Sequence, residues 1–129
     1  MRGPNLNGAR YVSFNNRTRQ SSVATRAKVA DGYFSRLVGL LGTTRAWPQP
    51  GRGLWIVPSR GVHTLGMKYS LDLIFLDREH RVVEVQENIR PWRISKVTLQ
   101  AHSVLELPAG TLARTETCVG DQLEVSPAL

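Results

Sequence analysis

The sequence has a single cysteine, Cys118, in 129 residues. One thiol cannot form an internal disulfide, and a metal cluster built on cysteines is excluded. No histidine lies near Cys118 in the sequence, so we expect a small buried hydrophobe rather than a catalytic thiol. The three histidines form neither a His-x-His nor a His-Glu-x-x-His spacing. We therefore predict no metal site and no cofactor.

Long apolar runs are also missing from the chain. None approaches the roughly 18 residues that suggest a membrane span. Residues 1–20 have scattered hydrophobes and no apolar centre of the kind that a secretory signal needs. We therefore expect a cytoplasmic protein that makes no membrane contact. No G-x-G-x-x-G, phosphate-loop or nucleophile-elbow sequence is present, so the usual signatures of nucleotide binding and serine hydrolysis are lacking.

Acidic residues are scarce in the first half of the chain. Residues 1–62 contain ten lysines and arginines but one acid, Asp31, whereas the rest contains seven bases and nine acids. A basic half can attract nucleic acid, anionic lipid or an acidic partner through its long-range field. No aromatic-rich RNA motif or helix-turn-helix pattern accompanies the charge. A solvated basic surface is therefore the simpler interpretation, and nucleic-acid binding is the alternative.

The length and a hydrophobic content of 41% are typical of one globular domain with one core. We expect a flexible N-terminus at residues 1–9, a single domain at residues 10–126, a frayed end at residues 127–129, and a monomer.

Short strands dominate the predicted structure. Apolar patterns predict strands at residues 10–14, 21–30, 53–57, 81–87, 101–108 and 119–125, with a turn at Asn15-Asn16 after the first. Apolar residues at helical spacing predict one short amphipathic helix between Asp31, an N-cap residue, and Gly42. Residues 111–118 favour one helical turn. The predicted fold is mainly β (α+β), a small antiparallel β-barrel with these two helical pieces.

The most apolar stretch of the sequence, residues 61–77, also carries polar side chains. Its length predicts a bend near Gly66 and residues 68–70, which separates a strand at 62–67 from a strand at 71–77 with two buried faces. Asp72 lies on one of those faces and needs donors there. Either Lys68 or backbone N–H groups can supply them, so Asp72 is a satisfied structural carboxylate or part of a binding site.

A candidate pocket follows from the polar residues near this stretch. His63 and Met67 point toward an apolar side, where core packing is the alternative for both. The sequence RPWR at residues 90–93 either binds a flat or anionic ligand or places Trp92 as a lid over the barrel mouth. Glu106 either faces solvent or pairs with Arg93. The candidate ligand-binding residues are His63, Met67, Lys68, Asp72, Trp92, Arg93 and Glu106.

The order of several segments resembles the DUF192 (UPF0127) family over about residues 23–125. The segments are RLVGLLG, GLWIV, VHTLGMKYSLDLIFLDREHRVVEV, RPW, VLELPAGT and GD. Members commonly carry an aromatic residue before the Met-Lys pair and Asn-Thr after it, where this chain has Gly66 and Tyr69-Ser70. The resemblance implies a compact, mainly β domain with a helix near its start, and it implies no catalytic residue.

Three functional hypotheses remain open. The first is an uncharacterised, non-enzymatic binding domain for a small anionic ligand or a protein partner, in which Lys68 and Arg93 receive the anion, Trp92 stacks and Asp72 orients Lys68. The second is a hydrolase or transferase with Asp72 or Glu106 as general base beside His63. The third is nucleic-acid binding through the basic N-terminal half.

Overall fold

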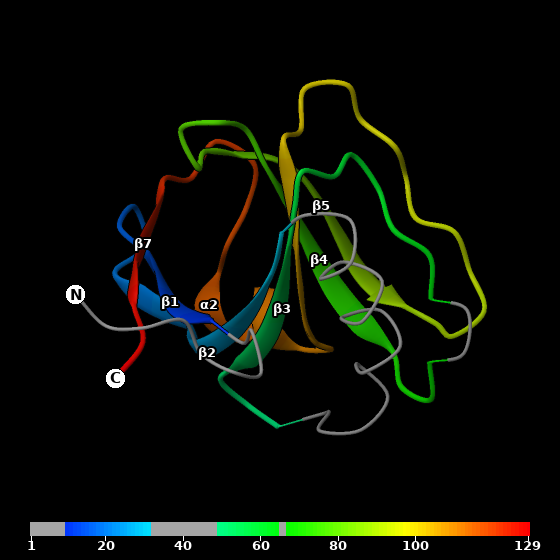
Figure 1. Ribbon diagram of the computed structural model, residues 1–129, viewed down its shortest axis with the longest axis horizontal. Coiled ribbons are helices and arrows are strands. Elements are labelled where there is room, and N and C mark those ends of the chain that lie inside the picture. The colour runs from blue at the N-terminus through cyan, green and yellow to red at the C-terminus, as the bar shows by residue number, and fades with distance from the viewer. Residues whose placement is uncertain (1–9, 32–48, 65–66) are drawn as a thin grey trace.

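The computed structural model describes residues 10–31, 49–64 and 67–129. Within these ranges seven strands form one sheet, in the order β5-β4-β6-β3-β2-β1-β7 (Figure 1). The strands are β1 (Tyr11–Asn16), β2 (Ser21–Asp31), β3 (Arg52–Val57), β4 (Leu71–Leu76), β5 (Val82–Ile89), β6 (Ser103–Pro108) and β7 (Leu123–Pro127), and a short helix, α2 (Thr111–Thr115), precedes β7. The mainly β prediction is confirmed. The helix predicted between Asp31 and Gly42 falls outside the described residues, apart from Asp31, which ends β2.

The sheet is mixed, and the prediction of an antiparallel sheet is wrong at one pair. Strands β2 and β3 run parallel, with Ala27 opposite Gly53 and Val29 opposite Trp55. Parallel strands need a crossover of about a dozen residues or more, and the connection between them, residues 32–51, is longer than that. The glycines and prolines of this connection predict a loop, but they do not indicate the direction of the strand that follows.

The sheet is a half-barrel rather than a closed barrel. Its edge strands, β5 and β7, approach each other at one end, where Arg81 and Gln122 form an isolated bridge. There the N–H of Val82 donates to the carbonyl of Asp121 at 2.8 Å, and the N–H of Leu123 donates to the carbonyl of His80 at 3.0 Å. No further pairing of β5 with β7 is present in the described residues, so the curl closes at that end alone.

Two hydrophobic clusters lie on opposite faces of the sheet. One cluster includes Val82 of β5, at one end of the strand order, together with Phe14 of β1 and Leu123 of β7 at the other end. Because it joins both ends of a curled sheet, this cluster fills the inside of the half-barrel. The other, which includes Leu73 and Val104, covers the outer face of the central strands. Every residue of β4 and β6 is buried as a result. The prediction that the strand at 71–77 has two buried faces is confirmed.

The first turn of the chain differs from its prediction. Asn15 and Asn16 belong to β1, and the turn falls on residues 17–20. The local pattern is misleading because the side chain of Asn16 is buried and bonded to residues near the C-terminus. At that end β7 reaches Pro127, and Ala128 N donates to the carbonyl of Tyr11 at 3.2 Å.

Residues 58–64, which follow β3, run side by side with residues 90–102, which join β5 to β6, and we call the two segments together the arm. The N–H of Ser59 donates to His102 O at 2.8 Å, and the N–H of Ser95 donates to Val62 O at 2.9 Å. In Figure 1 the arm is the green segment after β3 together with the yellow segment between β5 and β6, on the right. The strand predicted at 62–67 is therefore a single bridge between His63 and Ile94 in its described part.

Candidate functional site

Asp72 is fully buried in β4, and its carboxylate binds backbone N–H groups. Its Oδ1 accepts a hydrogen bond from Asn88 N at 2.9 Å, while Oδ2 accepts from Gly110 N at 3.1 Å and Leu112 N at 2.8 Å. These donors offset the cost of removing a carboxylate from water. Lys68 is exposed and forms neither an ion pair nor a hydrogen bond with Asp72 among the described residues, so the predicted role of Asp72 in orienting Lys68 is not observed. The structure favours the structural role for Asp72.

Glu106 is the opposite case, a buried carboxyl with an oxygen that has no partner among the described residues. It lies in β6 between Leu54 of β3 and Leu73 of β4, it is 1% exposed, and its Oε2 makes no hydrogen bond with the described part of the chain. Burial raises the pKa of Glu106 to about 8, because desolvation disfavours the charged form. Neither expectation for Glu106 holds, since it does not face solvent and Arg93 is exposed on the arm.

Three of the predicted site residues, His63, Trp92 and Arg93, lie on the arm and are exposed. The neighbouring Thr64 holds their backbone: its carbonyl accepts from Trp92 N at 2.9 Å, and its Oγ1 accepts from Arg93 N at 2.8 Å. Trp92 is therefore not a lid over the barrel mouth. Met67 is buried in the outer cluster, in agreement with a packing role.

The structure thus distributes the seven predicted residues over different environments. Three are on the arm, Lys68 is exposed beyond it, Met67 packs in the outer core, and Asp72 and Glu106 lie within the sheet. None of the seven lines either of the two surface hollows described next.

These hollows adjoin each other at one end of the central strands β3, β4 and β6. The larger encloses about 500 Å³ and the smaller about 250 Å³, and they share Arg60, Arg78, Ala101 and His102. We call them together the arginine cleft. Both β3 and β4 run antiparallel to β6, so the turns after β3 and β4 lie where β6 begins. This topology brings together Arg60, Arg78 and His102, which are far apart in the sequence.

The guanidinium groups of Arg60 and Arg78 are available to a ligand. Neither makes an ion pair or a hydrogen bond with the part of the chain that the structure describes. The nearby Asp77 is occupied, because its Oδ1 accepts from Glu79 N and Arg81 N, both at 2.9 Å. Two guanidiniums beside an imidazole match the oxygens of a carboxylate or phosphate. Sequence reasoning missed this site because no local motif links its residues.

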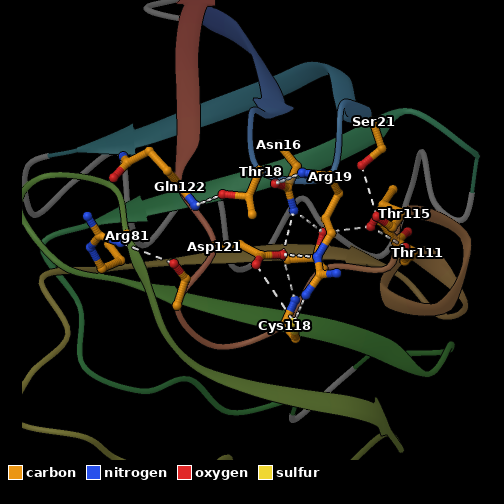
Figure 2. Close-up of polar contacts among 12 residues, drawn as sticks. Asn16, Thr18, Arg19, Ser21, Arg81, Thr111, Thr115, Cys118, Asp121 and Gln122 are labelled. Carbon is orange, nitrogen blue, oxygen red and sulfur yellow. Dashed lines mark hydrogen bonds and ion pairs between the residues drawn. The ribbon is translucent and has the colours of Figure 1, made fainter.

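A polar cluster around Asp121 joins the β1–β2 turn to the segment before β7 (Figure 2). Asp121 Oδ2 accepts from Asn16 Nδ2 at 3.0 Å, Arg19 Nε at 3.1 Å and Cys118 N at 3.0 Å. Desolvation alone would raise the pKa of Asp121, but the hydrogen bonds from Asn16, Cys118 N and Arg19 outweigh it and lower the pKa. The hydrogen bond from Arg19 to Asp121, together with its hydrogen bond to the Cys118 side chain, raises the pKa of Arg19. The cluster holds two distant parts of the fold together.

Cys118 belongs to this cluster, and the prediction of a buried hydrophobe is wrong. The thiol is partly exposed, and Arg19 Nη2 donates to its Sγ at 2.6 Å. Within residues 10–31, 49–64 and 67–129, no three His, Cys, Asp or Glu side chains are grouped so that they could hold a metal ion. In the same ranges, no helix has the length and hydropathy to cross a membrane.

Several bases of the N-terminal half have local partners. Arg10 forms an ion pair with Asp31 at 2.7 Å, Arg19 bonds to Asp121, and Arg26 lies over the ring of Tyr11 at 3.9 Å. The charges of Arg10 and Arg19 are therefore compensated by carboxylates within the described residues.

The DUF192 family model, described as Uncharacterized ACR, COG1430, matches residues 14–125. A UPF0127 protein of Thermococcus sibiricus is 31% identical over 115 residues, which cover 84% of this chain and 71% of that protein. A UPF0127 protein of Pyrococcus abyssi is 33% identical over 105 residues, which cover 77% of this chain and 85% of that protein.

Two solved structures share the fold. A protein of unknown function from Novosphingobium aromaticivorans superposes with a TM-score of 0.73 at 20% identity, over 90% of this chain and 84% of that one. A putative transcription regulator from Sinorhizobium meliloti gives a TM-score of 0.73 at 23% identity, over 91% of this chain and 93% of that one.

Proposed function

Since the chain belongs to the DUF192 (UPF0127) family, we propose its function from its own geometry: it is a small, non-enzymatic binding domain that receives an anionic group in the arginine cleft. The observation that carries this proposal is the presence of Arg60 and Arg78, from two separate turns, in one hollow of about 500 Å³. Neither guanidinium is bonded within the described part of the chain. The chemistry fits a phosphate or a carboxylate.

The cleft favours a small anion over an extended one. Asp77 and Glu79 line the smaller hollow beside the same two arginines. A ligand with negative charge spread over a long chain would come close to these carboxylates and be repelled. A compact anion can instead bind at the larger hollow, which no acid lines.

Binding without catalysis fits the groups in the cleft. Ser59 is the residue with a hydroxyl group in the lining of the larger hollow, and its Oγ donates a hydrogen bond to Gly61 O at 2.7 Å. A serine nucleophile needs a general base to accept its proton, and here a backbone carbonyl takes that place. The backbone of His102 is fixed, since its N–H donates to Leu76 O at 2.7 Å and its carbonyl accepts from Ser59 N at 2.8 Å. His102 lines both hollows, so its imidazole can add a further contact to the anion.

The experiment is a calorimetric titration of the full chain with inorganic phosphate, pyrophosphate and citrate. We expect saturable binding by at least one of them, weakened about tenfold or more by Arg60→Gln and by Arg78→Gln, since each removes a charge-assisted hydrogen bond. Arg17→Gln is the matched control, because Arg17 is exposed and lies outside the cleft. Equal binding by all variants, or none with any anion, contradicts the proposal.

An oligonucleotide titration separates the nucleic-acid alternative. Tight binding that falls steeply with salt, survives Arg60→Gln with Arg78→Gln and is lost with Arg17→Gln and Lys28→Gln would assign the function to the basic N-terminal half instead.

A further inference from the structure

Large exposed hydrophobic side chains are concentrated on the arm. Trp92, Ile94, Val97 and Leu99 are between 64% and 80% exposed, and among the described residues only Val119 and Leu129 are comparable. Single exposed hydrophobes are common on protein surfaces, but four within eight residues of one loop are not, and such groupings mark interaction surfaces.

Hydrogen bonds within the arm hold these side chains outward. Ser95 is buried, its Oγ accepts from Val62 N at 2.9 Å, and Thr98 N donates to Arg60 O at 3.1 Å. A Cβ atom on Gly61 would lie 2.9 Å from Lys96 O and 3.0 Å from a methyl group of Val97, so the two segments are in close contact. The exposed side chains are therefore carried by a packed frame.

The arm is also basic throughout. Its two segments contain Arg60, Arg90, Arg93 and Lys96 and neither Asp nor Glu. Within the described residues, the ion pair formed by these bases joins Lys96 Nζ to Glu84 Oε2 of β5 at 3.8 Å. Aromatic and aliphatic side chains framed by arginines and lysines are the composition that binds the headgroup region of an anionic bilayer.

We propose that the arm docks the protein reversibly onto an anionic bilayer, with Trp92, Ile94 and Val97 among the headgroups and Arg90 and Arg93 on lipid phosphates. The shape of the arm favours a bilayer over a protein groove or an acidic peptide. In Figure 1 the arm projects at the right beyond the sheet, and Trp92, Ile94 and Val97 are highly exposed and line neither hollow of the arginine cleft. The contact is with the bilayer surface, so it needs no spanning segment.

This proposal does not depend on the arginine cleft, because Trp92, Ile94 and Val97 line neither of its hollows. The test is co-sedimentation of the full chain with vesicles of phosphatidylcholine alone or mixed with phosphatidylglycerol. We expect binding to the mixed vesicles only, weakened by salt through screening of the arginines. Tryptophan fluorescence should shift to shorter wavelength on binding, and Trp92→Phe should remove most of that shift.

Two pairs of variants, each with a matched control, examine the two components of the contact. The double variant Ile94→Ser with Val97→Ser should lower the vesicle partition coefficient about tenfold or more, since less apolar area enters the interface. Val119→Ser is its control, because Val119 is 55% exposed and lies between α2 and β7. Arg90→Gln with Arg93→Gln should weaken binding to mixed vesicles, whereas Arg17→Gln should not.

Folding is not expected to limit this test, because all the substituted side chains are exposed, and circular dichroism checks it. Absence of vesicle binding, equal binding to neutral and mixed vesicles, or unchanged binding by the Ile94 and Val97 double variant would each overturn the proposal. Binding of acidic peptides with apolar residues, in the absence of vesicle binding, would overturn it in favour of a protein partner.

Discussion

Asp72 and Glu106 lie on adjacent strands one residue out of register, with Asp72 opposite Leu107 and Glu106 opposite Leu73. Because side chains alternate along a strand, the two carboxyl groups point to opposite faces of the sheet. The carboxylate of Asp72, on the inner face, accepts three backbone hydrogen bonds, whereas Oε2 of Glu106, on the outer face, accepts none from the residues that the structure describes. Two buried acids in neighbouring strands therefore have opposite consequences for stability.

Asp72→Ala should destabilise the fold strongly. It removes the acceptor for Asn88 N, Gly110 N and Leu112 N together, and each buried N–H left unsatisfied costs about 1–3 kcal/mol. We expect the free energy of unfolding in urea to fall by about 3 kcal/mol or more in Asp72→Ala. The loss should be smaller in Asp72→Asn, because the amide oxygen of the new side chain still accepts hydrogen bonds. Glu124→Ala, at an exposed position, is the control. A loss no larger than that of the control would exclude the structural role of Asp72.

Glu106→Gln should remove a pH dependence of stability. The pKa of Glu106 is about 8 in the folded protein and near its ordinary value of 4.5 when unfolded, so the unfolded chain releases the proton first. The stability that Glu106 contributes is complete below the unfolded pKa and is lost as pH rises through the folded pKa. Between about pH 5 and about pH 8, the wild type should lose up to roughly 1.4 kcal/mol per pH unit relative to Glu106→Gln.

Urea unfolding of both proteins at about pH 5, 7 and 9 provides the comparison. Parallel stability profiles would show that the carboxyl of Glu106 has a partner or that its pKa is not raised. Glu87→Gln serves as a control for the charge change alone, because Glu87 is exposed on β5.

Burial on both faces of a strand can be predicted from the sequence, whereas distant partners cannot. The strand at Leu71–Leu76 and its two buried faces follow from a mostly apolar run bounded by turn signals. The strand at Ser103–Pro108 is also predicted, but the burial of Glu106 within it is not. The donors to Asp72 lie 16 to 40 residues away. The cleft arginines come from separate turns, and the parallel pairing of β2 with β3 depends on a connection whose direction leaves no local pattern. These features depend on how the strands are connected and ordered, and the local spacing of residues does not predict that.

Asp121 should make the protein sensitive to acid. Its pKa is lowered in the folded state, so its stabilising contribution is present above the unfolded pKa, near 3.8, and is lost as pH falls through the folded pKa. Asp121→Asn should be less stable than the wild type at neutral pH, and the difference should shrink below about pH 4. Chemical unfolding along a pH series measures this. A constant difference down to the lowest pH would mean that the charge of Asp121 is not what holds the cluster together.

Gly61→Val should separate the two segments of the arm without unfolding the sheet. The new Cβ would lie 2.9 Å from Lys96 O and 3.0 Å from a Val97 methyl group, closer than neighbouring atoms allow. Since Gly61 lies outside every strand, we expect the strands to remain paired while trypsin cuts faster after Arg93 and Lys96, where local opening exposes the backbone. Cleavage after Arg17, in the β1–β2 turn, is the internal reference. If cleavage at all three sites rises equally, the arm and the sheet unfold as one unit; if none rises, the close contact at Gly61 does not hold the arm together.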